Sequence, residues 1–194
     1  FVSIEVEVMD EENGKKSKKG YSKMQQLLLL AKSQRDDNER YTAQLAIMSI
    51  LVIFKDILPS YRIRVPTVQE MAVKVSKETK KLWDYERALL HHYQVFLKLL
   101  EKTFDDKSST LGTVSVTAMI SMAELLKSAY HFNFRSYLIT AVVRQMNAKK
   151  ASVRDACCEA VQYVFANDAQ GEVALETARQ VAKVIKDRGF QVQA

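Results

Sequence analysis

Apolar residues from Tyr21 onward recur every three or four positions, which is the spacing of helices rather than of strands. The series is strongest within about residues 39–58, where four apolar residues follow one another at i, i+4, i+7 and i+11: Ile47, Leu51, Phe54 and Leu58. Further apolar residues lie beside that row: Leu45, Met48 and Val52. This helix is apolar on most sides, so we expect it to lie at the centre of the core.

A second long series of apolar residues at helical spacing follows a break in the first helix. Pro59 ends the central helix, Pro66 pushes the residue before it into an extended conformation, and Thr67 with Glu70 forms a capping box that starts a new helix. No strong breaker follows until about Asp105, which predicts one very long helix of about 38 residues, or roughly 55 Å. Its first half has a thinner apolar stripe than its second half and is expected to project from the core.

Shorter series predict four further helices, at about residues 113–130, 134–146, 152–166 and 172–188. Ser152 with Asp155 resembles another capping box, and Gly189 is placed to end the last helix. Helices this short, joined by short loops, pack as antiparallel neighbours. The predicted fold class is therefore all-α, a HEAT- or armadillo-like α-solenoid of antiparallel helices with one very long helix, over residues 21–194.

Residues 1–20 have a different pattern. Apolar and polar residues alternate over 2–8, as in a strand, and a charged stretch then leads to a lysine cluster: Lys15, Lys16, Lys18 and Lys19. A lone strand cannot satisfy its own hydrogen bonds, so it would pair with a partner's sheet edge or lie in a groove; the alternative is a disordered tail. The lysines fit a nuclear-import or RNA-contacting patch. We treat 1–20 as an extended or disordered charged tail of a fragment that belongs to a longer protein.

Composition narrows the class of protein. Five glycines and two prolines in 194 residues are few, which favours long helices. Cys157 and Cys158 are adjacent and diverge around a helix, which indicates reduced thiols and a cytosolic or nuclear protein. The net charge of +6 is compatible with nucleic-acid binding but does not establish it. The most apolar run is about half the length that a membrane span needs, so no membrane association is expected.

The sequence offers little material for catalysis. His91 and His92 are adjacent and lack the i, i+4 geometry of a metal pair, and no phosphate-binding loop or nucleophile motif occurs. We therefore expect no enzymatic activity, no catalytic residue, no metal, no cofactor and no small-molecule substrate.

The strongest candidate site is a basic elbow, residues 59–66, together with the start of the helix that follows. Arg62 and Arg64 alternate with Tyr61 and Ile63, so both face one way if the segment is extended. Lysines continue the positive face along the helix: Lys74, Lys77, Lys80 and Lys81. These six cations suit phosphate, which makes them candidate RNA contacts. The alternative is that both arginines brace the elbow and that the lysines form an ordinary solvated face.

The linker His131-Phe132-Asn133-Phe134 has an unusual composition. Its two aromatic residues suggest a turn held by buried rings, with Asn133 or Ser136 capping the next helix. Stacking of Phe132 or Phe134 on a nucleic-acid base is the alternative.

These same places resemble one protein family. The chain carries FKDILPSYRIR (Phe54 to Arg64), VSKETKKL (Val75 to Leu82), DYE (Asp84 to Glu86), HFNFR (His131 to Arg135) and CCEAV (Cys157 to Val161). Their order and spacing across about residues 24–192 are similar to nucleolar complex-associated protein 3. The sequence departs from that family's pattern at Trp83, Tyr85 and Tyr130, and Trp83 removes one positive charge from the basic half of the helix.

The resemblance implies a nucleolar and nucleoplasmic assembly factor of early large-subunit ribosomal particles (pre-60S), without enzymatic activity. It also implies partners: a homologue of nucleolar complex protein 2, other pre-60S proteins and large-subunit pre-rRNA, with a role in rRNA processing. Two alternatives stay open. One is a scaffold that binds proteins alone, and the other is a chromatin-bound factor of replication initiation.

Overall fold

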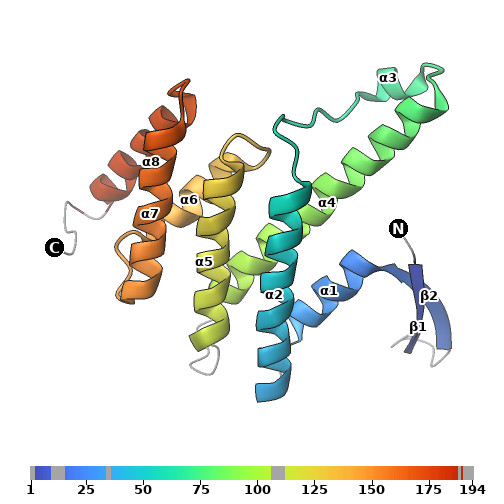
Figure 1. Ribbon diagram of the computed structural model, residues 1–194, viewed down its shortest axis with the longest axis horizontal. Coiled ribbons are helices and arrows are strands. Elements are labelled where there is room, and N and C mark those ends of the chain that lie inside the picture. The colour runs from blue at the N-terminus through green and yellow to red at the C-terminus, as the bar shows by residue number, and fades with distance from the viewer. Residues whose placement is uncertain (1–2, 10–15, 34–35, 106–111, 188, 190–194) are drawn as a thin grey trace.

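The computed structural model describes residues 3–9, 16–33, 36–105, 112–187 and 189, of which residues 3–9, 16–21, Val68 and Met71 are described by their backbone alone (Figure 1). Two strands come first: β1 (Ser3–Met9) and β2 (Lys16–Ser22). Helices make up nearly all the rest: α1 (Lys23–Lys32), α2 (Asp37–Ile57), α3 (Val68–Ala72), α4 (Lys77–Asp105), α5 (Gly112–Ala129), α6 (Arg135–Gln145), α7 (Ala151–Asn167) and α8 (Glu172–Asp187).

The helices form two layers. α2, α5 and α7 stand side by side in the front layer, and α4 and α6 lie behind α5 (Figure 1). α8 packs on α6 and α7, while α1 packs on α2 and α4. The prediction of an all-α, solenoid-like fold is confirmed for the helical part of the chain; a HEAT or armadillo repeat stays a prediction.

Aromatic rings fill the centre of the core. Phe54 from α2 packs against Tyr93 and Phe96 from α4, with ring centroids 5.2 and 5.5 Å apart. Phe132, from the loop before α6, meets the other side of Tyr93 at 5.6 Å. All four rings have no exposed surface. The two pairs of Tyr93 are edge-to-face and the pair of Phe54 with Phe96 is stacked. Both arrangements stabilise a core beyond the buried area of the rings, so the loop is joined to the helices through its ring.

Tyr93 offers a test of this core. Its hydroxyl is buried and has no hydrogen-bond partner among the described residues, and burial raises the pKa of the phenol well above its usual range. Replacing Tyr93 by phenylalanine removes an unpaired polar group, so thermal or urea unfolding should show equal stability or a gain of up to about 1 kcal/mol. A loss of about 1 kcal/mol or more would show that the hydroxyl is bonded in solution, for example to a buried water.

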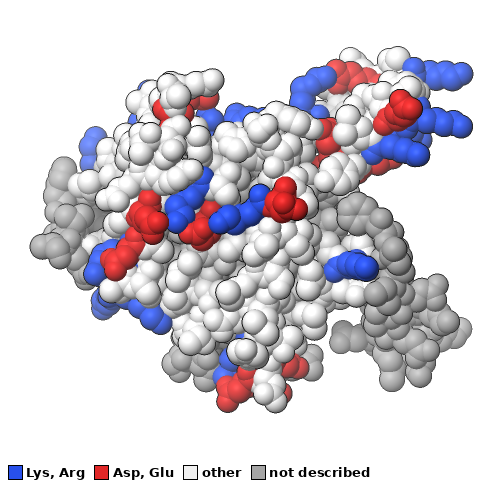
Figure 2. All heavy atoms as spheres, viewed as in Figure 1, with Lys and Arg blue, Asp and Glu red and all other residues white. Residues whose placement is uncertain are grey.

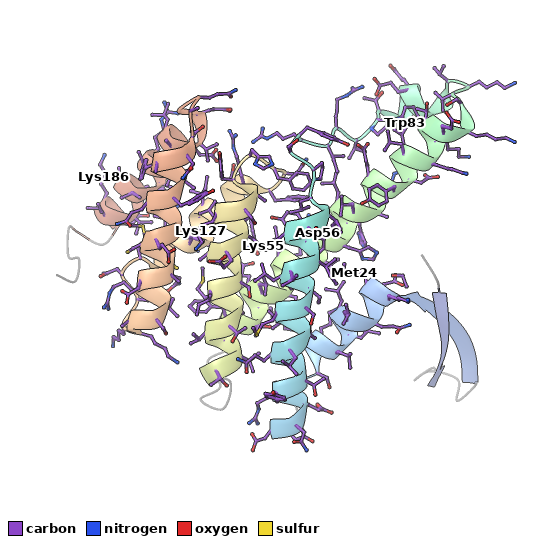
Figure 3. The ribbon with its side chains drawn as sticks, in the orientation of Figure 1. Met24, Lys55, Asp56, Trp83, Lys127 and Lys186 are labelled. Atoms are coloured by element: carbon purple, nitrogen blue, oxygen red, sulfur yellow. The ribbon has the colours of Figure 1, made fainter. Side chains whose placement is uncertain are left out.

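Ion pairs cross the front layer in a row. Lys55 of α2 pairs with Glu124 of α5 at 2.9 Å, Glu124 pairs with Lys127, and Lys127 pairs with Glu159 of α7 at 3.1 Å. Figure 2 shows this row, and Figure 3 places Lys55 and Lys127 on neighbouring helices. The row is partly exposed, so each pair contributes little to stability on its own.

The extended segment at the N-terminus has its pairing partner within the chain. β1 and β2 pair antiparallel, from Ser3 opposite Ser22 to Met9 opposite Lys16. The second strand holds most of the lysine cluster, and β2 leads directly into α1. The division of the chain at residue 20 stays a prediction, and the charged stretch 10–15 lies outside the described residues.

Two helix boundaries differ from those predicted. The very long helix is interrupted: α3 ends at Ala72, and α4 begins only at Lys77. The Ser76 hydroxyl accepts a hydrogen bond from the Thr79 N–H at 3.1 Å, so this serine caps a new helix that the apolar spacing did not indicate. The capping box predicted at Ser152 is also wrong, because α7 begins at Ala151 and has no side-chain cap.

The central helix α2 is less covered than predicted. Its inner face is buried, but four apolar residues on another face are about half exposed or more: Tyr41, Leu45, Met48 and Val52. The sequence shows how apolar a helix is, whereas coverage depends on which neighbours are present.

Candidate nucleic-acid interface

The elbow is held by the loop before α6. The Ile63 N–H donates to Asn133 Oδ1 and the Asn133 amide Nδ2 donates to the Ile63 carbonyl, both at 2.9 Å. His131 Nε2 lies 3.3 Å from the Pro59 carbonyl oxygen, and the Ile63 side chain is buried. A single asparagine therefore satisfies both backbone groups of one elbow residue, as a neighbouring strand would. We call the elbow 59–66 and the loop 131–134 together the clamp.

The loop adopts a turn that differs from the predicted one. Phe134, the residue before α6, has a left-handed backbone with φ of 64°, and no side chain caps the helix there. Asn133, predicted as a possible cap, reaches across to the elbow instead. Phe132 is fully buried, which excludes the alternative that it stacks on a base in this conformation.

The two elbow arginines are exposed on either side of buried Ile63, and they have different partners. Arg62 Nε donates to the His131 carbonyl at 3.3 Å. Arg64 pairs with Glu70 at 2.8 Å, and Glu70 also forms the predicted capping box with Thr67. Hydrogen bonds from Arg64 and from the Thr67 N–H hold the pKa of Glu70 below its usual value. Both arginines thus brace the elbow through at least one contact.

The lysines lie on a projecting part of the molecule. We define residues 68–88, which comprise α3, its linker and the first turns of α4, as the arm. It extends beyond the helical layers in Figure 1, and the first buried residue of α4 is Leu89. The predicted lysines are all exposed: Lys74, Lys77, Lys80 and Lys81. In Figure 2, Lys and Arg side chains extend into solvent at this end.

The arm has two unlike faces. Helical spacing at about 100° per residue places Lys77 and Lys80 on the side opposite the stripe that continues into the core, whereas Lys81 lies at the flank of that stripe, in line with buried Leu99. Asp84 shares the lysine face and reduces its charge. Leu82 lies on the stripe side but is half exposed, because nothing described packs on it there. Trp83 stands on the arm in Figure 3, well away from the layered helices.

A hydrogen bond connects the elbow to the arm. The Tyr61 hydroxyl donates to Glu86 Oε1 at 2.9 Å, although Tyr61 is 54% exposed. This bond and the negative charge of Glu86 raise the pKa of Tyr61. The elbow therefore contacts the loop 131–134 through Ile63 and the arm through Tyr61.

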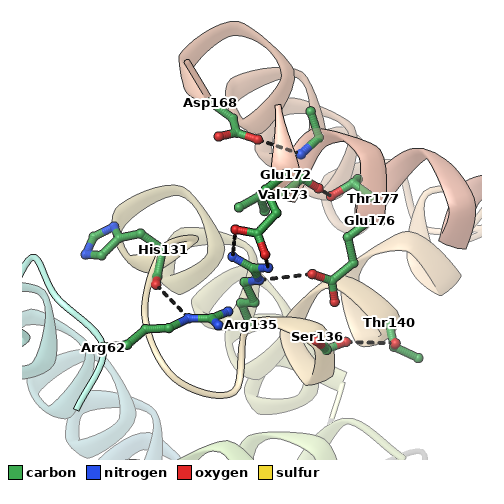
Figure 4. A network of polar contacts seen from close by, with 11 residues as sticks. Arg62, His131, Arg135, Ser136, Thr140, Asp168, Glu172, Val173, Glu176 and Thr177 are labelled. Atoms are coloured by element: carbon green, nitrogen blue, oxygen red, sulfur yellow. Dashed lines mark hydrogen bonds and ion pairs between the residues drawn. The ribbon is translucent and has the colours of Figure 1, made fainter. Parts of the chain in front are cut away.

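The sequence did not indicate a second polar cluster beside the clamp. Arg135 is nearly buried and bonds Glu172 Oε1 at 2.6 Å and Glu176 Oε2 at 2.9 Å, which fastens α6 to α8 (Figure 4). Arg62 reaches the same place from the elbow, and both arginines line a cavity of about 400 Å³. The contact of α6 with α8 brings Arg135 to its two glutamates, and the hydrogen bond to His131 brings Arg62 there, so sequence spacing gave no signal.

This cluster predicts a pH dependence of stability. The Arg135 guanidinium holds the pKa of Glu172 below its usual value of 4.5. A carboxyl whose pKa is depressed on folding stabilises the folded state above its unfolded pKa and loses that effect as the pH falls. Unfolding by urea should therefore show stability that declines below about pH 4.5.

Replacement of Arg135 by methionine should lower stability at neutral pH and also flatten this acid-side decline. Arg179→Met, on an exposed position of the same helix as Glu172, serves as the control and should leave the decline intact. An unchanged decline in the Arg135 variant would show that other carboxyls cause it.

Within the described residues, no group of three or more His, Cys, Asp or Glu side chains could hold a metal ion, and no helix is long and apolar enough to cross a membrane. The two cysteines are free thiols. Burial raises the pKa of Cys157 to about 12, so it is almost entirely protonated at neutral pH and a poor nucleophile.

The family model and the known proteins that are similar to this chain all carry the name of a nucleolar complex protein. Residues 8–96 match the family model described as nucleolar complex-associated protein. Nucleolar complex-associated protein 3 of Arabidopsis thaliana is 36% identical over 160 residues, which are 81% of this chain and 19% of that protein. Nucleolar complex protein 3 homolog of Mus musculus is 32% identical over 183 residues, 88% of this chain and 23% of that protein. The relative in Saccharomyces cerevisiae, nucleolar complex-associated protein 3, is 30% identical over 158 residues, 78% of this chain and 24% of that protein.

The chain spans between about a fifth and a quarter of the length of these curated relatives. The clamp lies partly inside the stretch that the family model matches, through the elbow, and partly beyond it, through the loop 131–134.

Proposed function

Because this chain belongs to the nucleolar complex-associated protein 3 family, we propose that it acts in the nucleolus as a non-enzymatic assembly factor of early large-subunit ribosomal particles. Its role there is that of a helical scaffold, with one surface on pre-rRNA and another on protein. The observation that carries the RNA part is the arm, which presents four exposed lysines on a projecting segment.

The geometry supports a contact with the RNA backbone rather than with bases. Lysine ammonium groups are point charges that attract phosphate without distinguishing sequence. Phe132 of the clamp is fully buried and offers no ring for a base to stack on. The arm would thus add affinity that depends on salt, while the RNA fold supplies the specificity.

On the protein side we propose a homologue of nucleolar complex protein 2, within a pre-60S particle. The names of the relatives describe members of a nucleolar complex, which supports assembly with other proteins. A scaffold that binds proteins alone is the second candidate. It is favoured by the internal contacts of Arg62 and Arg64 and by the uncovered apolar face of α2.

UV crosslinking of the tagged full-length protein in cells, followed by sequencing of the recovered RNA, distinguishes the assembly factor that contacts RNA from the scaffold that binds proteins alone. Reads concentrated on a few segments of large-subunit pre-rRNA support the assembly factor with an RNA face. Background RNA alone, with the protein partner still recovered, would leave the protein-only scaffold.

A further inference from the structure

The uncovered face of α2 forms a continuous apolar strip. Tyr41, Leu45, Met48 and Val52 are 64%, 48%, 49% and 65% exposed. Their spacing of four, three and four residues places them in a sector of about 60° along three turns of the helix. From residue 41 to residue 54 the helix contains no charged residue. Isolated exposed apolar residues are ordinary, but a continuous strip with polar edges is typical of a protein-binding surface.

A carboxylate lies at each end of the strip. Asp37 lies one turn before Tyr41, and Asp56 lies one turn after Val52, both on the same side of the helix. Asp37 is 96% exposed, although it pairs with Arg40, and the acidic Asp36 and Glu39 lie beside it. At the other end, Lys55 forms an ion pair with Glu124. The exposed charge at that end of the strip is therefore the carboxylate of Asp56. Figure 3 shows Asp56 at that end of α2.

The surroundings of the strip are neutral. Figure 2 shows the face over α2 and α5 with charged side chains in the row across its upper part and again at its lower end, with uncharged residues between. The row of ion pairs has no net charge, because it contains two lysines and two glutamates: Lys55, Lys127, Glu124 and Glu159. RNA is a poor occupant here, since the exposed charges at the ends of the strip are negative.

A second copy of this chain is also a poor occupant. Two strips laid against each other would bring carboxylate to carboxylate at both ends, whether the helices run parallel or antiparallel. The complementary occupant has basic residues at both ends of an apolar row. Asp37 and Asp56 are 19 residues apart in sequence, which is about 28 Å along the helix, so the occupant needs about five helical turns.

We propose that the strip of α2 docks an amphipathic helix of a second protein, with apolar residues at i, i+3 or i+4 and i+7 and with Lys or Arg at both ends. This helix would pack its apolar row on Tyr41, Leu45, Met48 and Val52, as helices do in grooves and bundles. Its terminal cations would meet Asp37 and Asp56 and set the register. The inference deepens the protein side of the proposed function and is independent of RNA binding.

Site-specific photocrosslinking tests the proposal. Benzoylphenylalanine replaces Met48 in the tagged full-length protein in cells, and the crosslinked peptide is sequenced after nuclease treatment. We expect a peptide of another protein whose sequence has a helical apolar row flanked by Lys or Arg. The same crosslinker at Leu175, which is 52% exposed on α8, should not give that peptide. A peptide from another copy, from the same chain or without basic ends would overturn the proposal.

Charge substitutions give an independent readout. Leu45→Glu should reduce recovery of the crosslinked partner at least tenfold, and Leu175→Glu should leave it unchanged; both positions are about half exposed, so both variants should fold. Asp56→Lys should weaken the same complex, and less so at high salt. Unchanged recovery with Leu45→Glu, in a variant with a normal melting curve, would rule the strip out. Because these tests follow crosslinking with nuclease treatment, their failure differs from a failure of RNA binding.

Discussion

Replacing Asn133 by alanine should lower the free energy of unfolding by about 3 kcal/mol, measured by urea denaturation. The side chain donates to the Ile63 carbonyl and accepts from the Ile63 N–H, both at 2.9 Å in a part-buried setting. Alanine leaves a donor and an acceptor without partners, and each such group costs about 1–3 kcal/mol when it is shielded from water. The elbow should then move away from the loop, and Ile63 should become exposed.

Asn133→Asp removes only one of the two hydrogen bonds, the one that the Asn133 amide donates. It keeps an acceptor for the Ile63 N–H but places a carboxylate against the Ile63 carbonyl, so we expect it to destabilise about as much as alanine. Asn38→Ala, at an exposed position of α2, should change stability by less than about 0.5 kcal/mol. Asn133→Ala with stability equal to that of the Asn38 control would show that the clamp does not hold the elbow.

Reversal of Lys74, Lys77, Lys80 and Lys81 to glutamate should weaken binding to a large-subunit pre-rRNA fragment at least about tenfold. The plot of log binding constant against log salt concentration should also become shallower by about 3, since each lost phosphate contact on single strands removes about 0.7. All four lysines are exposed and have no described ion pair, so the fold should be unaffected.

A matched control has the same change in net charge. Four other exposed lysines, away from the arm, are reversed to glutamate: Lys98, Lys102, Lys149 and Lys183. Binding measured by fluorescence anisotropy should fall clearly less in this control. An equal loss in both variants would mean that the total charge, rather than the arm, attracts RNA. Reversal of Arg64 is less informative, because it also removes the partner of Glu70 in the cap of α3.

Apolar spacing predicted most of the helices because burial imposes a period on the chain. α2, α5, α6, α7 and α8 begin and end within about two residues of the expected positions. The capping box at Thr67 was also predicted correctly, since it depends on residues three apart. Gly189 adopts a left-handed backbone and donates its N–H to the Lys186 carbonyl, as a residue that ends a helix should.

The features that sequence could not show depend on contacts between distant residues. Asn133 and Ile63 are 70 positions apart, and a local pattern suggested only that Asn133 would cap its own helix. The helix that begins after the break is capped by a single serine hydroxyl at Ser76, whose spacing to Thr79 is too common to stand out. The strip on α2 was expected to be covered, because an apolar helix does not reveal whether its neighbour belongs to the same chain.

The same limit applies to the candidate site. Alternation predicted that Arg62 and Arg64 face one way, and both are exposed on either side of buried Ile63, although Tyr61 is exposed as well. It did not indicate that the His131 carbonyl and Glu70 would take part in their hydrogen bonding. The exposure of the lysines could be predicted without knowing any tertiary contact, because a projecting helix exposes the polar side chains that it carries.

The most direct test of the proposed RNA contact of the arm is to identify the peptides that UV light crosslinks to RNA in the full-length protein within cells. Mass spectrometry of nucleotide-modified peptides then locates the contact along this chain. We predict modified peptides from the arm, residues 68–88, carrying nucleotides of large-subunit pre-rRNA. Modified peptides from other parts of the protein, with the arm recovered only in unmodified form, would contradict the assignment of the arm as the RNA-binding surface.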